Sequence, residues 1–183
     1  MRNKRKRNNR KLLLILILLL FGVSVGYAAL STSLSINGTT KISTNTWNIY
    51  FTNVSVTSGS ETATTAPTAT GTTTTSLTYA VTLSLPGDYY EFTVDVKNGG
   101  TIDAKLSAAP TLSGLSTAQK VYTSYTVTYS DGTAIAAGDT IAAGASKTLK
   151  VRVQYRTDIT ASQLPTSAQT LSLTCTLNYV QAW

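Results

Sequence analysis

Acid–base chemistry in this chain has to come from carboxylates, because its 183 residues include no histidine. That composition excludes Ser-His-Asp triads, Cys-His pairs and HExxH zinc sites together. Among the eight acidic residues, Asp88 and Glu91 are close in sequence, and a glycosidase needs two carboxylates about 5–10 Å apart in a cleft. Asp88 lies in a predicted turn and Glu91 at the start of a predicted strand, which favours solvated acids over a catalytic pair.

Motifs that bind metals, phosphates or cofactors are missing from the sequence as well. It contains no calcium loop of the DxDxDG type and no glycine-rich phosphate loop. The sequons at Asn37 and Asn53 matter only in a host with N-glycosylation machinery. We therefore predict no catalytic residue, no metal site and no cofactor, and a protein that is not an enzyme.

Thiol chemistry depends on a single residue, Cys175. In the segment "LSLTCTLNYV" it shares one sheet face with Leu171, Leu173 and Leu177. An intermolecular disulfide or a reactive nucleophile is the functional alternative. The apolar neighbours favour a buried thiol that behaves as a small hydrophobic side chain. No internal disulfide can form, so the core or neighbouring subunits must hold the domain.

Ten tyrosines give the chain a potential binding surface for sugars or proteins. Tyr89 and Tyr90 follow a predicted turn, and Tyr125 lies in a strand-like segment. Tyrosine is also common in strands, so we interpret these residues as half-buried scaffold. A well-formed pocket lined by Tyr89, Tyr90 or Tyr125 would instead indicate a binding module.

The basic character of the chain is confined to its start. Residues 1–11, "MRNKRKRNNRK", hold seven of the 15 cations, and the remaining eight balance the eight acids. Because residues 12–183 sum to zero charge, the body has no electrostatic footprint for nucleic acid. We predict no nucleic-acid partner.

An apolar run follows the basic start and ends in small residues, the three-part pattern of a secretory signal. Cleavage after Ala28 would leave Ala29 as the new N-terminus and Gly26 at the −3 position. The alternative is an uncleaved anchor, because residues 12–30 reach the low end of a spanning length. Either way the chain beyond this segment is exported and lies outside the cytoplasmic membrane, free or anchored with its C-terminus outside.

Almost every segment after residue 30 alternates apolar and polar side chains with a period of two, as in "LSTSLSI", "WNIYF", "FTVDV" and "LKVRVQYR". Such alternation is typical of antiparallel strands with one buried and one solvated face. The segments at 122–130, 75–85 and 171–179 continue the pattern. We predict an all-β fold of seven to nine short strands, an antiparallel β-sandwich of the jelly-roll or immunoglobulin-like kind.

Turn residues separate the predicted strands, and Asp131-Gly132 predicts a hairpin. Gly87 and Gly144 each precede an alternating triad by five residues, which indicates two similar turns feeding strands at an edge of the sandwich. The segments near 116 and at 157–165 predict a helical turn or two. The threonine-rich piece near 58–75 is either a glycosylated stalk or, as we favour, a loop that enters the next strand.

The stretch from Leu83 to Leu106 resembles the exported TasA/camelysin group of Gram-positive bacteria. It reads as a Leu-x-Pro-Gly-Asp turn, an alternating strand, an Asn-Gly turn and a continuing strand, and it follows a signal segment that closes in Gly-Tyr-Ala-Ala. The resemblance covers about a quarter of the chain. The turn and strand residues that carry it are Pro86, Gly87, Asp88, Phe92, Val94, Val96, Asn98 and Gly99, together with Leu83, Leu85, Ile102 and Leu106.

That resemblance implies a jelly-roll-like sandwich that assembles into extracellular fibres of a biofilm matrix by lending an N-terminal strand to the next subunit. Two features depart from the group: the strand after the signal reads "LSTSLSINGTTKI", and the long charged insertions of the fibre-forming member are missing. A protease activity ascribed to camelysin is not carried over, because no metal ligands match.

We expect two parts: residues 1–28 as signal peptide or membrane anchor, and residues 29–183 as the sandwich. The new N-terminus is an alternating neutral strand, and a free strand complements an open sheet edge. The residues predicted to exchange with a neighbouring subunit are Leu30, Thr32, Leu34 and Ile36. The alternative is that they form an edge strand of their own domain.

The leading prediction of function is a secreted or surface-tethered structural protein that self-associates through strand pairing. An adhesin-like binding module for carbohydrate or protein is the first alternative. A pilin-like subunit with an uncleaved helix is the second, although the segment lacks the Glu that follows a type IV pilin processing site.

Overall fold

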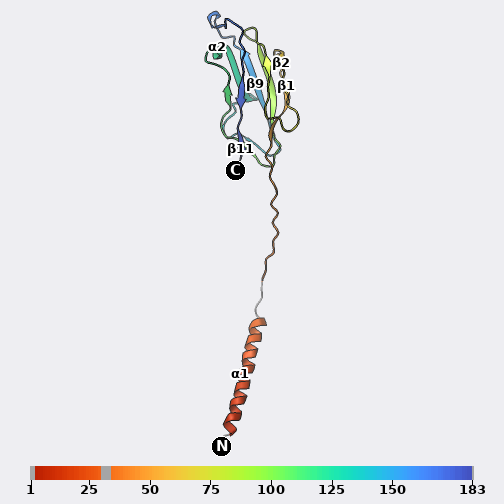
Figure 1. Cartoon of the computed structure of the whole chain (residues 1–183), viewed down its shortest axis with the longest axis vertical. Helices are drawn as coiled ribbons and strands as arrows, with labels where there is room; N and C mark the ends of the chain where they lie inside the picture. Colours follow the sequence, from red (N-terminus) through yellow and green to blue (C-terminus); the bar gives the residue numbers. More distant parts are fainter. Residues whose placement is uncertain (1–2, 30–33, 183) are drawn as a thin grey trace. The chain divides into compact units, whose positions relative to one another are not determined.

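The computed structural model of the chain describes residues 3–29 and 34–182 (Figure 1). The chain divides into two compact units, Met1–Ser43 and Thr44–Trp183. The predicted boundary at 28/29 concerns cleavage of the chain and stays a prediction. Within the second unit the described strands are all paired antiparallel, which confirms the β-rich, antiparallel character predicted from the alternation.

The first unit contains the helix α1, Asn3–Ala29, so Gly26, Ala28 and Ala29 of the predicted cleavage site are helical. Its apolar side chains between 12 and 23 are exposed, Leu18 by 78 % and Leu12 by 71 %. Of the helices in the described residues, none combines the length and continuous apolarity needed to cross a membrane.

Residues 34–48 follow without a strand or helix. Leu34 and Ile36 are 94 % and 101 % exposed, and Ile42 is 90 % exposed. Residues 34–36 are not part of a strand in the described structure, so the edge strand considered as an alternative for 29–36 is not seen over these three residues. Leu30 and Thr32 of the predicted exchange strand lie outside the described residues.

A four-stranded antiparallel sheet in the order β1-β4-β9-β7 is the largest element of the second unit. Its strands are β1 (Ile49–Val56), β4 (Tyr89–Asn98), β9 (Ser146–Tyr155) and β7 (Thr123–Tyr129). The central pair, β4 and β9, is continuous from Tyr89↔Gln154 to Lys97↔Ser146. The alternating segments 92–96, 123–129 and 149–155 are thus confirmed as strands.

Shorter strands make three further sheets, β11-β5-β8, β10-β6 and β2-β3. They are β2 (Ala63–Thr65), β3 (Ala80–Val81), β5 (Ala104–Leu106), β6 (Thr111–Ser113), β8 (Thr140–Ile141), β10 (Thr174–Thr176) and β11 (Tyr179–Gln181). The described residues hold eleven strands, more than the seven to nine predicted, because several predicted strands are broken into two- or three-residue pieces.

The core lies between the apolar face of the four-stranded sheet and the strands β5 and β8. Its buried side chains are Tyr90, Phe92, Val94, Val96, Leu106, Ile135, Ile141, Leu149, Val151 and Val153. Period-two alternation puts the polar residues of β4 and β9 on the opposite face, where Arg152 and Glu91 form an ion pair of 2.9 Å. The buried core therefore combines side chains of the four-stranded sheet with Leu106 of β5 and Ile141 of β8, and the single cysteine of the chain is free.

The predicted turns bound β4 at both ends. Before it, Gly87 adopts φ +109°, a conformation open to glycine, and the Asp88 carboxylate accepts hydrogen bonds from the backbone nitrogens of Ser84 and Leu85, both at 2.7 Å. After it, Asn98-Gly99-Gly100 makes a corner. Both turn predictions are confirmed.

Two predictions about connections are wrong. The chain turns at Asp131-Gly132, and the Tyr129 nitrogen donates to the Thr133 oxygen at 2.9 Å across the turn. No two-stranded hairpin forms, because residues 133–139 contain no strand and the strand paired with β7 is β9. The strands after Gly87 and Gly144, β4 and β9, lie at the centre of the sheet and pair with each other, and neither is an edge strand.

The remaining predicted elements are present, but each is shorter than predicted. Helix α2, Gln119–Tyr122, and the single turn η1, Ala161–Gln163, occupy the two predicted helical positions. The threonine-rich piece is largely without regular structure, although β2 lies within it. The predicted strand over 75–85 is reduced to β3, because pairing partners extend along only that part.

Candidate functional site

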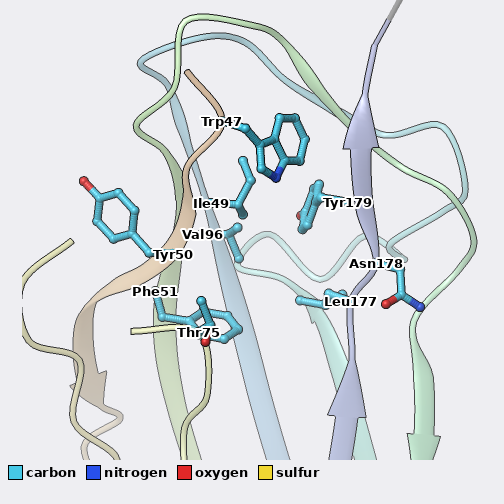
Figure 2. A pocket seen from close by; sticks show the side chains of 9 residues that line it. All are labelled: Trp47, Ile49, Tyr50, Phe51, Thr75, Val96, Leu177, Asn178 and Tyr179. Atoms are coloured by element: carbon cyan, nitrogen blue, oxygen red, sulfur yellow. The ribbon is translucent and has the colours of Figure 1, made fainter. Parts of the chain in front are cut away.

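A groove runs between the edge strand β1 and the C-terminal strands (Figure 2). Its volume is about 280 Å³. We call it the Trp47 groove, and it is lined by Trp47, Ile49, Tyr50, Phe51, Thr75, Val96, Leu177, Asn178 and Tyr179. Strand β11 lies at the edge of its own sheet, so the groove separates two sheet edges.

The corner at Asn98-Gly99-Gly100 positions the rim of the groove. Backbone nitrogens of Gly99 and Thr101 donate to the carbonyl oxygens of Asn48 and Thr46, at 2.8 and 3.0 Å, on either side of Trp47. A Cβ on Gly100 would lie 2.5 Å from the Thr46 oxygen. Only glycine permits this approach, so the corner fixes where the chain enters the sheet.

Asn98 anchors the corner from inside the protein. It is fully buried, and its Nδ2 donates to the carbonyl oxygens of Ile102 at 2.8 Å and Ile141 at 3.1 Å. Its Oδ1 accepts from the Gly100 nitrogen at 3.0 Å. Ile141 belongs to β8, so one side chain ties the end of β4 to the other sheet. A buried amide is stable only when its donors and acceptor are satisfied in this way.

Trp47 is 42 % exposed and faces two hollows. The second, about 540 Å³ and more open, is lined by Trp47, Lys105, Tyr179, Val180 and Gln181. Most of the residues that line the Trp47 groove are aromatic or aliphatic, and polar atoms, including those of Asn178 and Thr75, share its accessible surface with them (Figure 2). This composition suits an apolar or amphipathic ligand, such as a strand or a flat sugar face.

Tyr179 is the most perturbed side chain of the groove. Its hydroxyl is buried without a hydrogen-bond partner in the described part of the protein. Burial, followed by the negative charge of Asp139, raises the pKa of Tyr179 to about 12. The phenol is therefore neutral at physiological pH, and its ring serves as an apolar wall.

Most of the acidic residues are hydrogen-bond acceptors within the fold. Seven of the eight accept a hydrogen bond in a turn or from a neighbouring strand: Asp88, Glu91, Asp95, Asp103, Asp131, Asp139 and Asp158. Asp88 is a turn acid as predicted. Glu91 is not solvated as predicted, because strand pairing places it opposite Arg152 and buries it to 9 % exposure. In the described ranges no three His, Cys, Asp or Glu side chains meet to hold a metal.

The tyrosines singled out from the sequence are not brought together. Tyr90 is buried in the core, whereas the ring of Tyr89 lies on the polar face with the Arg152 guanidinium 3.9 Å from its centre. Tyr125 packs half-buried against the core. Phe92 and Val94 are also core residues, and of the family-like turn and strand residues only Val96 lines the groove. Neither of the two hollows in the described residues is lined by Tyr89, Tyr90 or Tyr125, whose positions fit the interpretation as scaffold.

Cys175 is half-buried in β10, on the side shared with Leu173 and Leu177. Burial raises the pKa of its thiol to about 11, so the nucleophilic thiolate is scarce at neutral pH. This geometry supports an inert packing thiol.

Sequence reasoning missed the groove residues Trp47, Tyr50, Asn178 and Tyr179. Their common position depends on which strands end beside one another, and a local pattern does not contain that information. A tryptophan at the start of an edge strand was the one available signal.

No family model matches this chain, and neither a curated protein nor a solved structure matches it. The resemblance to the TasA/camelysin group stays a prediction. Function is therefore argued from the geometry of the exposed segment and the groove.

Proposed function

We propose that the chain is an exported structural protein of a bacterial cell surface or extracellular matrix, whose antiparallel β-sandwich domain self-associates by N-terminal strand exchange. One observation carries this proposal. Leu34 and Ile36 are more than nine-tenths exposed at alternating positions of a segment without a partner strand. Alternating apolar side chains on an unpaired segment are costly in water and gain by adding to a sheet elsewhere.

The Trp47 groove supplies a fitting acceptor. It lies between the edges of β1 and β11 and has apolar walls at Ile49, Phe51 and Leu177. One backbone hydrogen bond, from the Phe51 nitrogen to the Thr74 oxygen at 2.7 Å, bridges the outer side of β1. A strand from a second copy would place its apolar side chains in the groove and its backbone along β11.

Export is supported by the exposed leucines of α1 and by its basic start. Seven cations precede an apolar run whose side chains are exposed from Leu12 to Val23. Such a segment is suited to the export machinery or to lipid, so residues 1–28 act as a signal peptide or as an anchor. Mass spectrometry of the mature N-terminus distinguishes the two, since cleavage leaves Ala29 first.

The test of assembly compares two double variants with the wild type by electron microscopy and light scattering. Leu34→Ser with Ile36→Ser removes the apolar side chains, and we expect polymerisation to be lost. Ser35→Ala with Thr39→Ala changes polar side chains in the same segment and should leave polymers intact. Unchanged polymerisation after deletion of residues 29–36 would refute strand exchange.

A second candidate is a carbohydrate-binding module, and the exposed Trp47 beside Tyr179 and Asn178 favours it. Sugars stack on aromatic rings while amides bind their hydroxyl groups. Titration with soluble glycans, followed by tryptophan fluorescence, would support this candidate if Trp47→Ala abolished a saturable signal. Strand exchange predicts no saturable response to glycans. It predicts instead that a peptide of residues 29–36 quenches the tryptophan fluorescence.

A further inference from the structure

The sequence contains two Asn-Gly pairs, Asn37-Gly38 and Asn98-Gly99, and the structure holds them in opposite states. Asn37 and Gly38 are exposed in the unpaired segment. A Cβ added to Gly38 would meet no atom within 4 Å. No hydrogen bond fixes the Asn37 amide or the Gly38 nitrogen in the described part of the protein. Nothing in the described residues therefore prevents the Asn37 side chain from turning toward the Gly38 nitrogen.

Asn98-Gly99 is locked at both reacting groups. The Asn98 amide makes its three hydrogen bonds in full burial. The Gly99 nitrogen donates to the Asn48 oxygen at 2.8 Å. Rotation of the side chain toward its own backbone would break all of these bonds, and the freed groups would be left unsatisfied in the interior.

We propose that Asn37 is a site of spontaneous deamidation, and that the fold protects Asn98 from the same reaction. The Gly38 nitrogen loses its proton to solvent base and attacks Cγ of Asn37. A bond from that nitrogen to Cγ forms, the bond from Cγ to Nδ2 breaks, and Nδ2 leaves as ammonia. Water then opens the cyclic imide at either carbonyl, which yields aspartate or isoaspartate. The sum consumes one water and releases one ammonia, with no oxidant or reductant.

Glycine makes the attack at Asn37 accessible, because the absence of a side chain leaves the nitrogen unhindered and the backbone free. The exposed segment provides the second requirement, rotation of Asn37 into the cyclising geometry. Both pairs have the same sequence, so the difference in their deamidation rates must come from the structure around each pair.

The modification would alter the segment in charge and in geometry. Lys41 is the single charged residue between 34 and 60, so a new carboxylate brings the charge of that stretch from +1 to zero. Isoaspartate also lengthens the backbone by one methylene between Ile36 and Ile42, which interrupts the period-two alternation. The consequence for assembly rests on the proposed function, whereas the chemistry does not.

The test follows the full chain at neutral pH by peptide mass spectrometry, with an isoaspartyl methyltransferase assay for the isomer. We expect the Asn37 peptide to gain the mass that replaces amide by acid. The Asn98 peptide should be modified at a rate on the order of a hundredfold lower, or lower still. Its reaction requires an opening of the fold that costs a few kcal/mol. In urea the two rates should converge.

Gly38→Val is the matched variant, since it hinders the nitrogen in a segment with no packing to lose, and it should slow the Asn37 reaction severalfold. Equal rates at Asn37 and Asn98 in the folded protein, or no effect of Gly38→Val, would overturn the proposal. Electron microscopy of the same samples scores assembly separately. Deamidation of Asn37 in samples that form no polymers would support the proposed modification and count against strand exchange. Polymers whose Asn37 stays unmodified would support strand exchange and overturn the proposed modification.

Discussion

The four-stranded sheet and the three-stranded sheet share one core but are built differently. In the first, β4 and β9 pair over their whole length with short turns at their ends. In the second, β8 has two residues and β5 and β11 have three each. Continuous strands bury one complete face, whereas short ones leave an edge and a groove. If the proposed strand exchange holds, the four-stranded sheet supplies most of the stability, and the short strands together with the edge strand β1 supply the surface that a donated strand meets.

The largest effect is expected from the centre of the four-stranded sheet. Phe92 is 2 % exposed and packs against Tyr79 and Tyr90, with ring centres 5.2 and 5.9 Å away. Phe92→Ala should destabilise the fold by about 3–5 kcal/mol, through lost burial and a cavity. Urea unfolding measures the change. A loss below about 1 kcal/mol would show that this sheet is not the main source of stability.

The next effect should come from Asn98, which joins the two sheets. Asn98→Ala would leave the Ile102 and Ile141 oxygens and the Gly100 nitrogen without that partner. We expect a loss of about 2–4 kcal/mol in the free energy of unfolding. Asn178→Ala is the exposed control and should have little effect. Equal losses for both variants would contradict a joining role for Asn98.

A smaller, pH-dependent effect is expected on the polar face of the same sheet. Burial acts to raise the pKa of Glu91, but hydrogen bonds from Arg152 and Thr57 and the charges of Arg152 and Lys150 together hold it below its ordinary value. A carboxyl whose pKa is lowered on folding stabilises the protein above its unfolded pKa, and this contribution is lost as the pH falls through the folded pKa.

Glu91→Gln should therefore cost about 1–2 kcal/mol at neutral pH. The gap between variant and wild type should close as the pH falls below the ordinary value of 4.5. Thermal unfolding at several pH values checks this. Asp158→Asn, in the exposed pair with Arg156, is the control and should leave stability nearly unchanged. A gap that stays constant with pH would rule out the ion pair as its cause.

The smallest effect belongs to the edge of the three-stranded sheet. Val180 in β11 is 42 % exposed, and Val180→Ala should change the free energy of unfolding by less than about 0.5 kcal/mol. Val180 lines the second hollow. If a donated strand pairs along β11 and covers that hollow, the same variant should weaken self-association measurably in sedimentation experiments. Strong destabilisation of the monomer would contradict the division between a stabilising sheet and a binding sheet.

Local pattern in the sequence predicted the strands of the larger sheet but little of the smaller ones. The alternation of Phe92, Val94 and Val96 is a property of adjacent residues, and it survives because β9 provides a partner along its length. The segment at 75–85 alternates equally well, yet most of it finds no partner. Asn98 was identified as a turn residue, but its burial depends on Ile141, far away in the sequence. Pairing between distant segments is what the local pattern lacks.

Figure 1 shows the start of the second unit close to β11 and to the C-terminus. Trp47, Val180 and Gln181 line the same hollow there. Tension applied between those two points would therefore not pull along the β4–β9 pair. It would open the groove and then peel β1 from β4 one residue pair at a time, starting at Ile49 and Asn98. We expect single-molecule pulling across residues 47 and 181 to show yielding at low force, with most of the fold intact. A donated strand that fills the groove would act as a mechanical lock, because it would load many hydrogen bonds in parallel.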